Sequence, residues 1–235
     1  MSLLFQTRRV GDVMVVSCRG RIIAGEEQAG EAVSLERHLE ELLRANRLVV
    51  LHLGDVDFID SAGFGMLVRC ATRSHSAAGE LRVCAVSPSV DHILNVTRLK
   101  PVLQPYDSED EAITEALRAR RDPASGTPNV LCVDESEDIL AYLRELLREN
   151  GHRAMTASNI RDARILLAAI QPRVVVVGAS VRATMLAGTY STDEFERLLA
   201  GCAVINLPPG FPRQEAGSSA EQVLAAIRSA TSTSL

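Results

Sequence analysis

The sequence predicts an α/β protein made of two successive domains. Short apolar, β-branched runs alternate with longer segments whose apolar residues recur every three to four positions, which is typical of strands alternating with helices. The clearest strand-like runs are "RLVVLHL" at 47–53 and "VVVV" at 174–177. The turn-rich stretch "RARRDPASGTPN" at 118–129 interrupts the alternation and predicts a domain boundary. We therefore expect a first domain over 1–120, a linker over 121–128 and a second domain over 129–235.

The composition limits the class of protein. The chain has 235 residues, of which 46% are hydrophobic, enough for a buried core in each half. A net charge of −5 and only 3% aromatic residues argue against a nucleic-acid partner. We see no signal peptide and no run that is long and apolar enough to span a membrane. Five scattered cysteines without a CxxC pair are expected to be reduced thiols, so we expect a cytoplasmic protein.

The first domain is expected to contain four strands and four helices. "GDV" at 11–13 is the predicted hairpin turn between the first two strands. The strands are expected at 3–9, 13–19, 48–53 and 81–86. The helices are expected at 26–45, 62–77, 88–97 and 109–120.

The stretch "DVDFIDSAGFGMLVRC" at 55–70 places a hydroxyl directly after an acid and before a helical pattern. Ser61 falls where a helix N-cap is expected, and capping alone would explain it. The alternative is a modification site, because a phosphate on Ser61 would meet free backbone N–H groups and the positive end of the helix dipole. It would also bring strong negative charge to the surface at this helix start, where it would affect the binding of any partner there. Both interpretations are open at this point.

Three motifs in residues 3–118 together resemble the STAS domain, and more narrowly the bacterial anti-sigma factor antagonists. "GRIIAGEE" at 20–27 is similar to the family's turn into its first helix, and "LVVLHLGDVDFIDSAGFGML" at 48–67 is similar to its central strand and acceptor loop. "GELRVCAVSPSVDHILNVTRL" at 79–99 is similar to the next strand and helix. The resemblance implies a STAS-type β-sheet with flanking helices.

The resemblance also implies a switch. In this family the serine after the loop acid is the phosphorylation acceptor, which corresponds here to Ser61 after Asp60. The implied partners are an anti-sigma factor, often itself the serine kinase, and a cognate phosphatase. The other residues that we assign to the acceptor loop and partner binding are Asp57, Gly63, Phe64 and Gly65. The alternative function is a scaffold or adaptor subunit of a larger signalling assembly, and homodimerisation is left open.

Several of these residues also have a structural explanation. The two glycines either allow a partner's backbone to approach or reflect tight helix packing. Asp57, like Asp55, is either part of the acceptor loop or a solvated turn residue. His52 departs from the family, which often has an acid there, and is either a partial pH sensor or a hydrogen-bonded polar residue at a strand end.

The second half resembles a response-regulator receiver that has lost its chemistry. The resemblance rests on "NVLCVDESEDILAYLRELLRENGHRAMTASN" at 129–159 and "ARILLAAIQPRVVVVGAS" at 163–180. It implies a flavodoxin-like, doubly wound parallel sheet, here truncated because the chain after Ser180 is short for the remaining elements. An unrelated flavodoxin-like domain is the alternative.

Two residues that receivers use for phosphotransfer are missing from this half. Gly178 stands where the phosphoacceptor aspartate should be, and the only lysine of the chain is Lys100 in the other half. Asp134 and Glu135 survive as the acid pair that holds Mg²⁺ in receivers, and they form either a weak, vestigial divalent-cation site or a solvated acidic turn. We expect no other cofactor, and an interaction or dimerisation module.

The sequence offers no basis for catalysis. It contains no nucleophilic triad at usable spacing, no P-loop, no metal-ligand cluster and no GxGxxG motif. We therefore expect a regulatory binding protein and not an enzyme.

Overall fold

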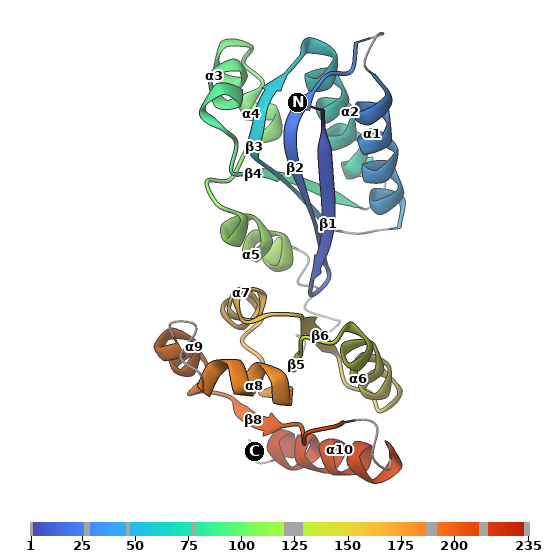
Figure 1. The fold of residues 1–235 in the computed structure, drawn as a ribbon, viewed down its shortest axis with the longest axis vertical. Coiled ribbons are helices and arrows are strands. Elements are labelled where there is room, and N and C mark those ends of the chain that lie inside the picture. The colour runs from blue at the N-terminus through green and yellow to red at the C-terminus, as the bar shows by residue number, and fades with distance from the viewer. Residues whose placement is uncertain are drawn as a thin grey trace. The chain divides into compact units, whose positions relative to one another are not determined.

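The chain divides into two compact units, Met1–Ala119 and Arg120–Leu235, which are described separately (Figure 1). The computed structural model describes residues 2–25, 29–45, 48–76, 79–119, 129–186, 192–211 and 216–232. The predicted linker, 121–128, lies outside the described residues. None of the helices in the described part of the chain has the length and apolar character needed to cross a membrane.

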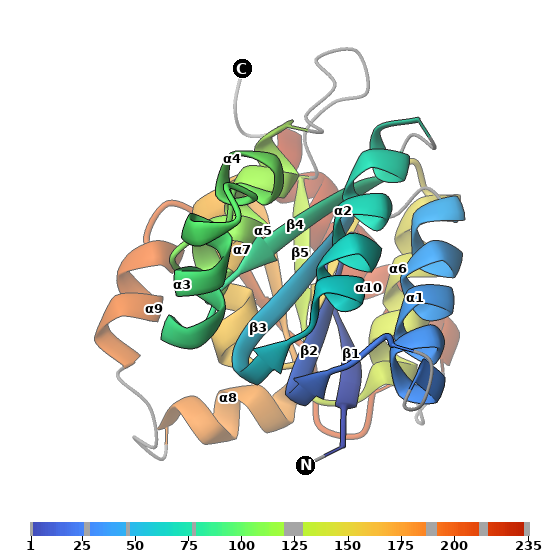
Figure 2. The same cartoon turned by 90° about the horizontal axis from the view of Figure 1, so that it is seen from above.

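The first unit is a mixed sheet with helices packed on it. Its strands are β1 (Leu4–Val10), β2 (Val13–Ile22), β3 (Leu48–Ile59) and β4 (Glu80–Cys84). Its helices are α1 (Ala29–Arg44), α2 (Ser61–Ser76), α3 (Pro88–Val96), α4 (Lys100–Leu103) and α5 (Glu109–Ala119). The strands lie in the order β1-β2-β3-β4, and the crossovers α1 and α2 connect parallel neighbours (Figure 2).

The two faces of this sheet are covered by different helices. β1 and β2 form an antiparallel hairpin whose turn includes Gly11 at φ +58°. Val49 and Leu51 of β3 join one core cluster with residues of α1, α2, α3 and α4. Val50 points to the opposite face, as strand alternation requires, and α5 packs on β3 and β4 there through residues such as Ile113. The central strand is therefore buried on both faces along its first half.

β3 is longer than the sequence predicted. The apolar run suggested a strand that ends at residue 53, whereas β3 continues to Ile59. Its parallel pairing with β2 continues across two register shifts, between Ser17 and Arg19 and between Gly20 and Arg21. This pairing with a neighbouring strand outweighs the low strand propensity of Gly and Asp in the second half of β3. α4 was not predicted either, because a single turn shows no apolar periodicity.

The second unit is a parallel sheet with helices on both faces. Its strands are β5 (Val130–Val133), β6 (Ala154–Ala157), β7 (Val174–Val177) and β8 (Ala203–Asn206). Its helices are α6 (Glu137–Glu149), α7 (Ile160–Ile170), α8 (Ala179–Leu186), α9 (Thr192–Leu199) and α10 (Ala216–Ser232). The strand order is β6-β5-β7-β8, with every neighbouring pair parallel.

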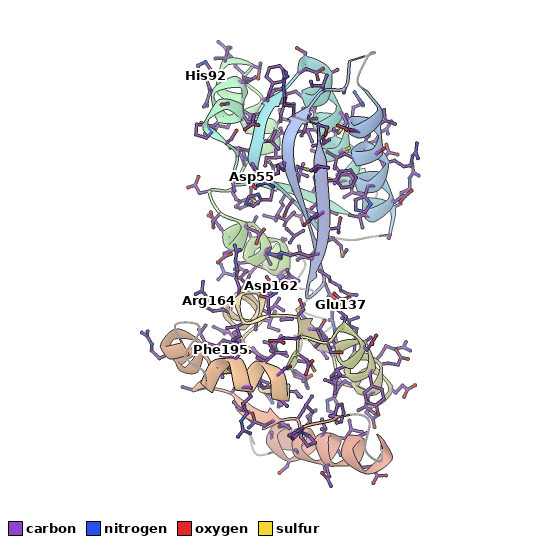
Figure 3. The ribbon with its side chains drawn as sticks, viewed as in Figure 1. Asp55, His92, Glu137, Asp162, Arg164 and Phe195 are labelled. Atoms are coloured by element: carbon purple, nitrogen blue, oxygen red, sulfur yellow. The ribbon has the colours of Figure 1, made fainter. Side chains whose placement is uncertain are left out.

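The "VVVV" strand of this unit is buried on both faces, as expected for a central parallel strand. Val174 and Val176 pack with α6 and α10, whereas α7 contacts β5 and β6 and also packs against α9. Phe195 of α9 is fully buried (Figure 3). α8 was not predicted. The described part of this unit contains four strands. β8 is the one strand of the sheet that follows β7 in the chain. The expectation that the chain after Ser180 is too short for a full flavodoxin-like domain stays a prediction.

Truncating the centre of the first sheet should be costly. Leu51→Ala removes a fully buried side chain, and we expect it to lower the free energy of unfolding by about 2–5 kcal/mol. Leu4→Ala, at a position that is 62% exposed, should change it by less than about 0.5 kcal/mol. Urea unfolding followed by circular dichroism measures both, and equal effects of the two variants would contradict the burial assigned to β3.

Candidate functional site

Ser61 is exposed and is the first residue of α2, directly after the turn from β3. The expected N-cap role of Ser61 is wrong, because the preceding residue, Asp60, caps the helix. Asp60 Oδ1 accepts a hydrogen bond from the Gly63 N–H at 2.6 Å, and the Asp60 carbonyl accepts from the Phe64 N–H at 2.9 Å. Both Asp and Ser are good caps, so the sequence pattern allowed either assignment. The hydroxyl of Ser61 is therefore free of the capping role.

Asp60 also connects α2 to the loop that follows β2. Its carboxylate accepts hydrogen bonds from the backbone N–H groups of Ala24 and Gly25, each at 3.2 Å. The Asp60 N–H donates to the Ile22 carbonyl at 3.1 Å. One side chain thus ties the end of β3, the start of α2 and the β2–α1 loop together, which fixes the backbone that carries Ser61.

These contacts determine the ionisation of Asp60. Burial alone would raise its pKa, but the backbone N–H groups of Gly63, Ala24 and Gly25 outweigh burial and lower the pKa below its ordinary value. Asp60 is thus ionised near neutral pH, and its charge strengthens the hydrogen bonds that hold the site.

The residues after Ser61 have different roles. A Cβ on Gly63 would lie 2.9 Å from Ile59 Cγ2 and 3.0 Å from the Ile22 carbonyl oxygen, so this glycine serves tight helix packing. Phe64 is 4% exposed and belongs to the core cluster, so its side chain is not available to a partner, contrary to our assignment. Gly65 is half-buried, and a Cβ there would lie 3.5 Å from Arg69 Nη1.

Asp55 and Asp57 are exposed residues of β3 and not turn or loop residues as expected (Figure 3 labels Asp55). Together with Leu4 and Arg19 they line an open groove of about 770 Å³ over the second half of β3. His52 is half-buried, and its Nδ1 accepts a hydrogen bond from the Gly54 N–H at 3.3 Å. This contact fits the hydrogen-bonded interpretation of His52.

A second group of predicted residues meets at the carboxyl ends of β5 and β7. Asp134 is 3% exposed, and its Oδ1 accepts from the Ser136 N–H at 2.7 Å. A Cβ on Gly178 would lie only 1.8 Å from Asp134 Oδ2, so the carboxylate occupies the space that a side chain at 178 would need. Burial raises the pKa of Asp134. The hydrogen bond from the Ser136 N–H lowers this pKa and the negative charge of Glu135 raises it, and the net effect is a pKa above the ordinary value.

Asp134 and Glu135 line a pocket of about 450 Å³ together with Ser136, Ile139, Ala179, Ser180, Leu207, Pro208, Gly210 and Phe211. Glu135 Oε1 accepts from the Thr184 hydroxyl at 3.4 Å. Within the described residues no group of three His, Cys, Asp or Glu side chains is placed to hold a metal ion. The divalent-cation site at this acid pair stays a prediction.

Comparison with known proteins places the first unit in a family. Residues 5–112 match the family described as the STAS domain. The anti-sigma F factor antagonist of Paenibacillus polymyxa is 26% identical over 115 residues, which cover 49% of this chain and 96% of that protein. The N-terminal unit is a STAS domain. The family match ends at residue 112, so it does not include the second unit.

Solved structures are also similar to this chain. An anti-sigma factor antagonist from Mycobacterium paratuberculosis matches with 22% identity over 49% of this chain and 94% of that chain, at a TM-score of 0.41. The Bacillus cell fate determinant SpoIIAA in its phosphorylated form matches with 18% identity over 48% of this chain and 98% of that chain, at a TM-score of 0.38.

The loop residues that hold Asp60 were not among the predicted site residues. Ala24 and Gly25 were noted only as part of the turn after the second strand. The signal that could have identified them is topological, because β2 and β3 are parallel and their carboxyl ends meet at the same sheet edge. An acid that follows one strand then lies beside the backbone that follows the other.

Neutralising Asp60 should weaken the STAS domain in a pH-dependent way. We expect Asp60→Asn to lower the free energy of unfolding by about 1 kcal/mol at pH 7, as for other lost caps. The folded-state pKa is lowered, so this stabilisation is present above the unfolded pKa and is lost as pH falls through the folded pKa. Urea unfolding at pH 7 and about pH 3 should show the difference shrinking in acid. Asp57→Asn is the control, and a pH-independent deficit for Asp60→Asn would contradict the assignment.

The contact at Gly178 gives a prediction for the second unit. Gly178→Ala should destabilise this unit by about 1–3 kcal/mol, because the new methyl group overlaps the Asp134 carboxylate. Adding Asp134→Ala removes that overlap, so the two changes should couple by about 1 kcal/mol or more in a double-mutant cycle. Gly201→Ala, where a Cβ meets nothing within 4 Å, is the control. Additive effects of the two substitutions would show that the predicted overlap does not exist.

Proposed function

We propose that this protein is an anti-sigma factor antagonist whose binding to an anti-sigma factor is switched by phosphorylation of Ser61. The observation that carries the proposal is the exposed hydroxyl of Ser61 on a backbone fixed by Asp60. The name of the Paenibacillus polymyxa relative, which aligns over almost its whole length, supports the antagonist role. The partner would be an anti-sigma factor that is itself a serine kinase, and a phosphatase would restore the unmodified form.

The proposed switch follows from charge and hydration. Phosphorylation adds about −1.5 to −2 charge at neutral pH. A partner that packs on the first turn of α2 would have to remove water from that charge, and desolvating an uncompensated ion is costly. Because Ser61 is not a cap, its modification leaves the Asp60 hydrogen bonds intact. The phosphate would therefore act on the binding surface and not on the stability of the helix.

We infer that the second unit is a receiver-like, flavodoxin-like module without phosphotransfer. The strand order β6-β5-β7-β8 with helices on both faces supports this inference, as does the position of Asp134 beside Gly178. A glycine at the end of β7 offers no carboxylate to phosphorylate. The proposed role of this unit is interaction or dimerisation, and we propose a cytoplasmic regulator with no catalytic activity of its own.

A paired pull-down with full-length protein tests the switch. Wild type and Ser61→Asp are used as baits in native lysate, and captured proteins are identified by mass spectrometry. Ser34→Asp is the matched control, because Ser34 is an exposed serine in α1 whose hydroxyl donates to the Gly30 carbonyl of its own helix. We expect an ATP-binding, kinase-like anti-sigma factor with wild type and Ser34→Asp, and at least about tenfold less with Ser61→Asp, which corresponds to about 1.4 kcal/mol.

Two results would contradict the proposal. Equal capture of the kinase by the wild-type and Ser61→Asp baits would show that a negative charge at Ser61 does not control binding. Absence of any such kinase from all three baits would favour a STAS scaffold or adaptor that is not gated by phosphorylation.

A further inference from the structure

Asp60 engages backbone donors at the start of α2. The Gly63 N–H donates to the Asp60 carboxylate and the Phe64 N–H donates to the Asp60 carbonyl. The Ala62 N–H also contributes to the lowered pKa of Asp60. Asp60 therefore takes up two of the N–H groups that could have held a phosphate on Ser61, and the expectation that free backbone donors hold it stays a prediction for the others. A nearby cationic side chain would be a stronger ligand for a phosphate than a backbone N–H group.

Arg69 lies on the same stripe of α2 as Ser61. Residues 61, 65 and 69 are spaced by four, so they follow one another along one side of the helix. Arg69 Nη1 lies 3.5 Å from the position that a Cβ on Gly65 would take, which places the guanidinium over the turn next to Ser61. Helical side chains lean toward the N-terminus, so the direction in which Arg69 points follows from the helix itself.

Gly65 places no side chain between Ser61 and the guanidinium. The rise from residue 61 to residue 65 is about 6 Å. A Cβ at 65 would be in van der Waals contact with Arg69 Nη1, and a side chain that extends beyond Cβ would compete with the guanidinium for this space. Ser61 and Arg69 are both exposed, Arg69 by 52% of its side chain, so a phosphate and the guanidinium can meet without moving the core.

The present partner of Arg69 leaves one nitrogen available. Arg69 Nη2 and Nε donate to Glu36 Oε1 of α1 at 2.9 and 3.3 Å. Within the described residues no acceptor is recorded for Nη1, the nitrogen nearest Gly65. One turn further along the two helices, Arg73 pairs with Glu40 at 2.5 Å. Both pairs join an arginine of α2 to a glutamate of α1, although Glu40 also pairs with Arg44 at 2.8 Å. Of the two arginines, Arg69 lies on the turn closer to the Ser61 end of α2.

We propose that Arg69 is the ligand that binds the phosphate on Ser61, reached across Gly65. This inference rests on the proposed function, because it presupposes that Ser61 is phosphorylated. Arg69 Nη1 donates to a phosphate oxygen, and the dianion then competes with the Glu36 carboxylate for the same guanidinium. Arg73 and Glu40 stay paired and keep α1 and α2 together. The phosphate is thereby held along the exposed face of α2, where it covers Gly65 and the surface around it.

The test does not need the kinase. Phosphoserine is incorporated at position 61 of the full chain by genetic encoding, and its titration is followed by ³¹P NMR. Arg69 favours the dianion, so Arg69→Gln should raise the second pKa of the phosphate by about half a unit relative to the wild-type phosphoprotein, less at high salt. Arg73→Gln removes the same charge from the next turn of the same helix and should shift the pKa by much less.

The outcomes separate this inference from the proposed function. A rise with Arg69→Gln that clearly exceeds the rise with Arg73→Gln supports Arg69 as the phosphate ligand. Equal shifts, or no shift with Arg69→Gln, overturn it, while the pull-down result for Ser61→Asp would stand unchanged. Gly65→Leu is a second variant that keeps Arg69 but fills the gap, and it should raise the phosphate pKa in the same direction as Arg69→Gln.

Discussion

The site in the first unit depends on the carboxylate of Asp60. This single group accepts hydrogen bonds from two segments that are more than thirty residues apart, the β2–α1 loop and the first turn of α2. Backbone donors keep it ionised in spite of burial, and in return it satisfies N–H groups that would otherwise lack partners at the helix start. Because Asp60 caps α2, the Ser61 side chain is not needed as a cap and stays exposed at the surface.

The length of β3 explains why this site lies at the surface and is still rigid. The first half of the strand is covered on both faces, by α1 and α2 on one side and α5 on the other. Its second half stays paired with β2 but carries exposed acids on the outward face. The packed half fixes the position of the strand, and the projecting half carries the Asp60 turn to the edge of the domain. Gly63 completes this arrangement because only a hydrogen fits between α2 and Ile22.

Local sequence patterns predicted most elements of the first unit and the central strand of the second, and the errors have a common cause. The predicted strands at 48–53 and 174–177 and the predicted helices of the first unit lie within a few residues of the observed elements, apart from the longer β3, because apolar periodicity is a local property. The extension of β3, the Asp60 cap and the burial of Phe64 depend on contacts with other elements, which periodicity does not contain. α4 and α8 were missed because they are short or weakly amphipathic. Ser61 itself was found from the family resemblance, whereas its separation from the capping role required the hydrogen bonds.

The packing around α2 constrains how a charge on Ser61 could be transmitted. Leu67 of α2 is fully buried in the core cluster, and Gly63 leaves no room for the helix to move toward β2. Such close-packed interiors resist small displacements, so we do not expect one added phosphate to rearrange the whole domain. The adjustable elements are the exposed ion pairs between α1 and α2, whose side chains can exchange partners at little energetic cost. A switch built this way changes the charge and shape of one helix face and leaves the fold unchanged, so the partner, and not the STAS domain, has to discriminate between the two states.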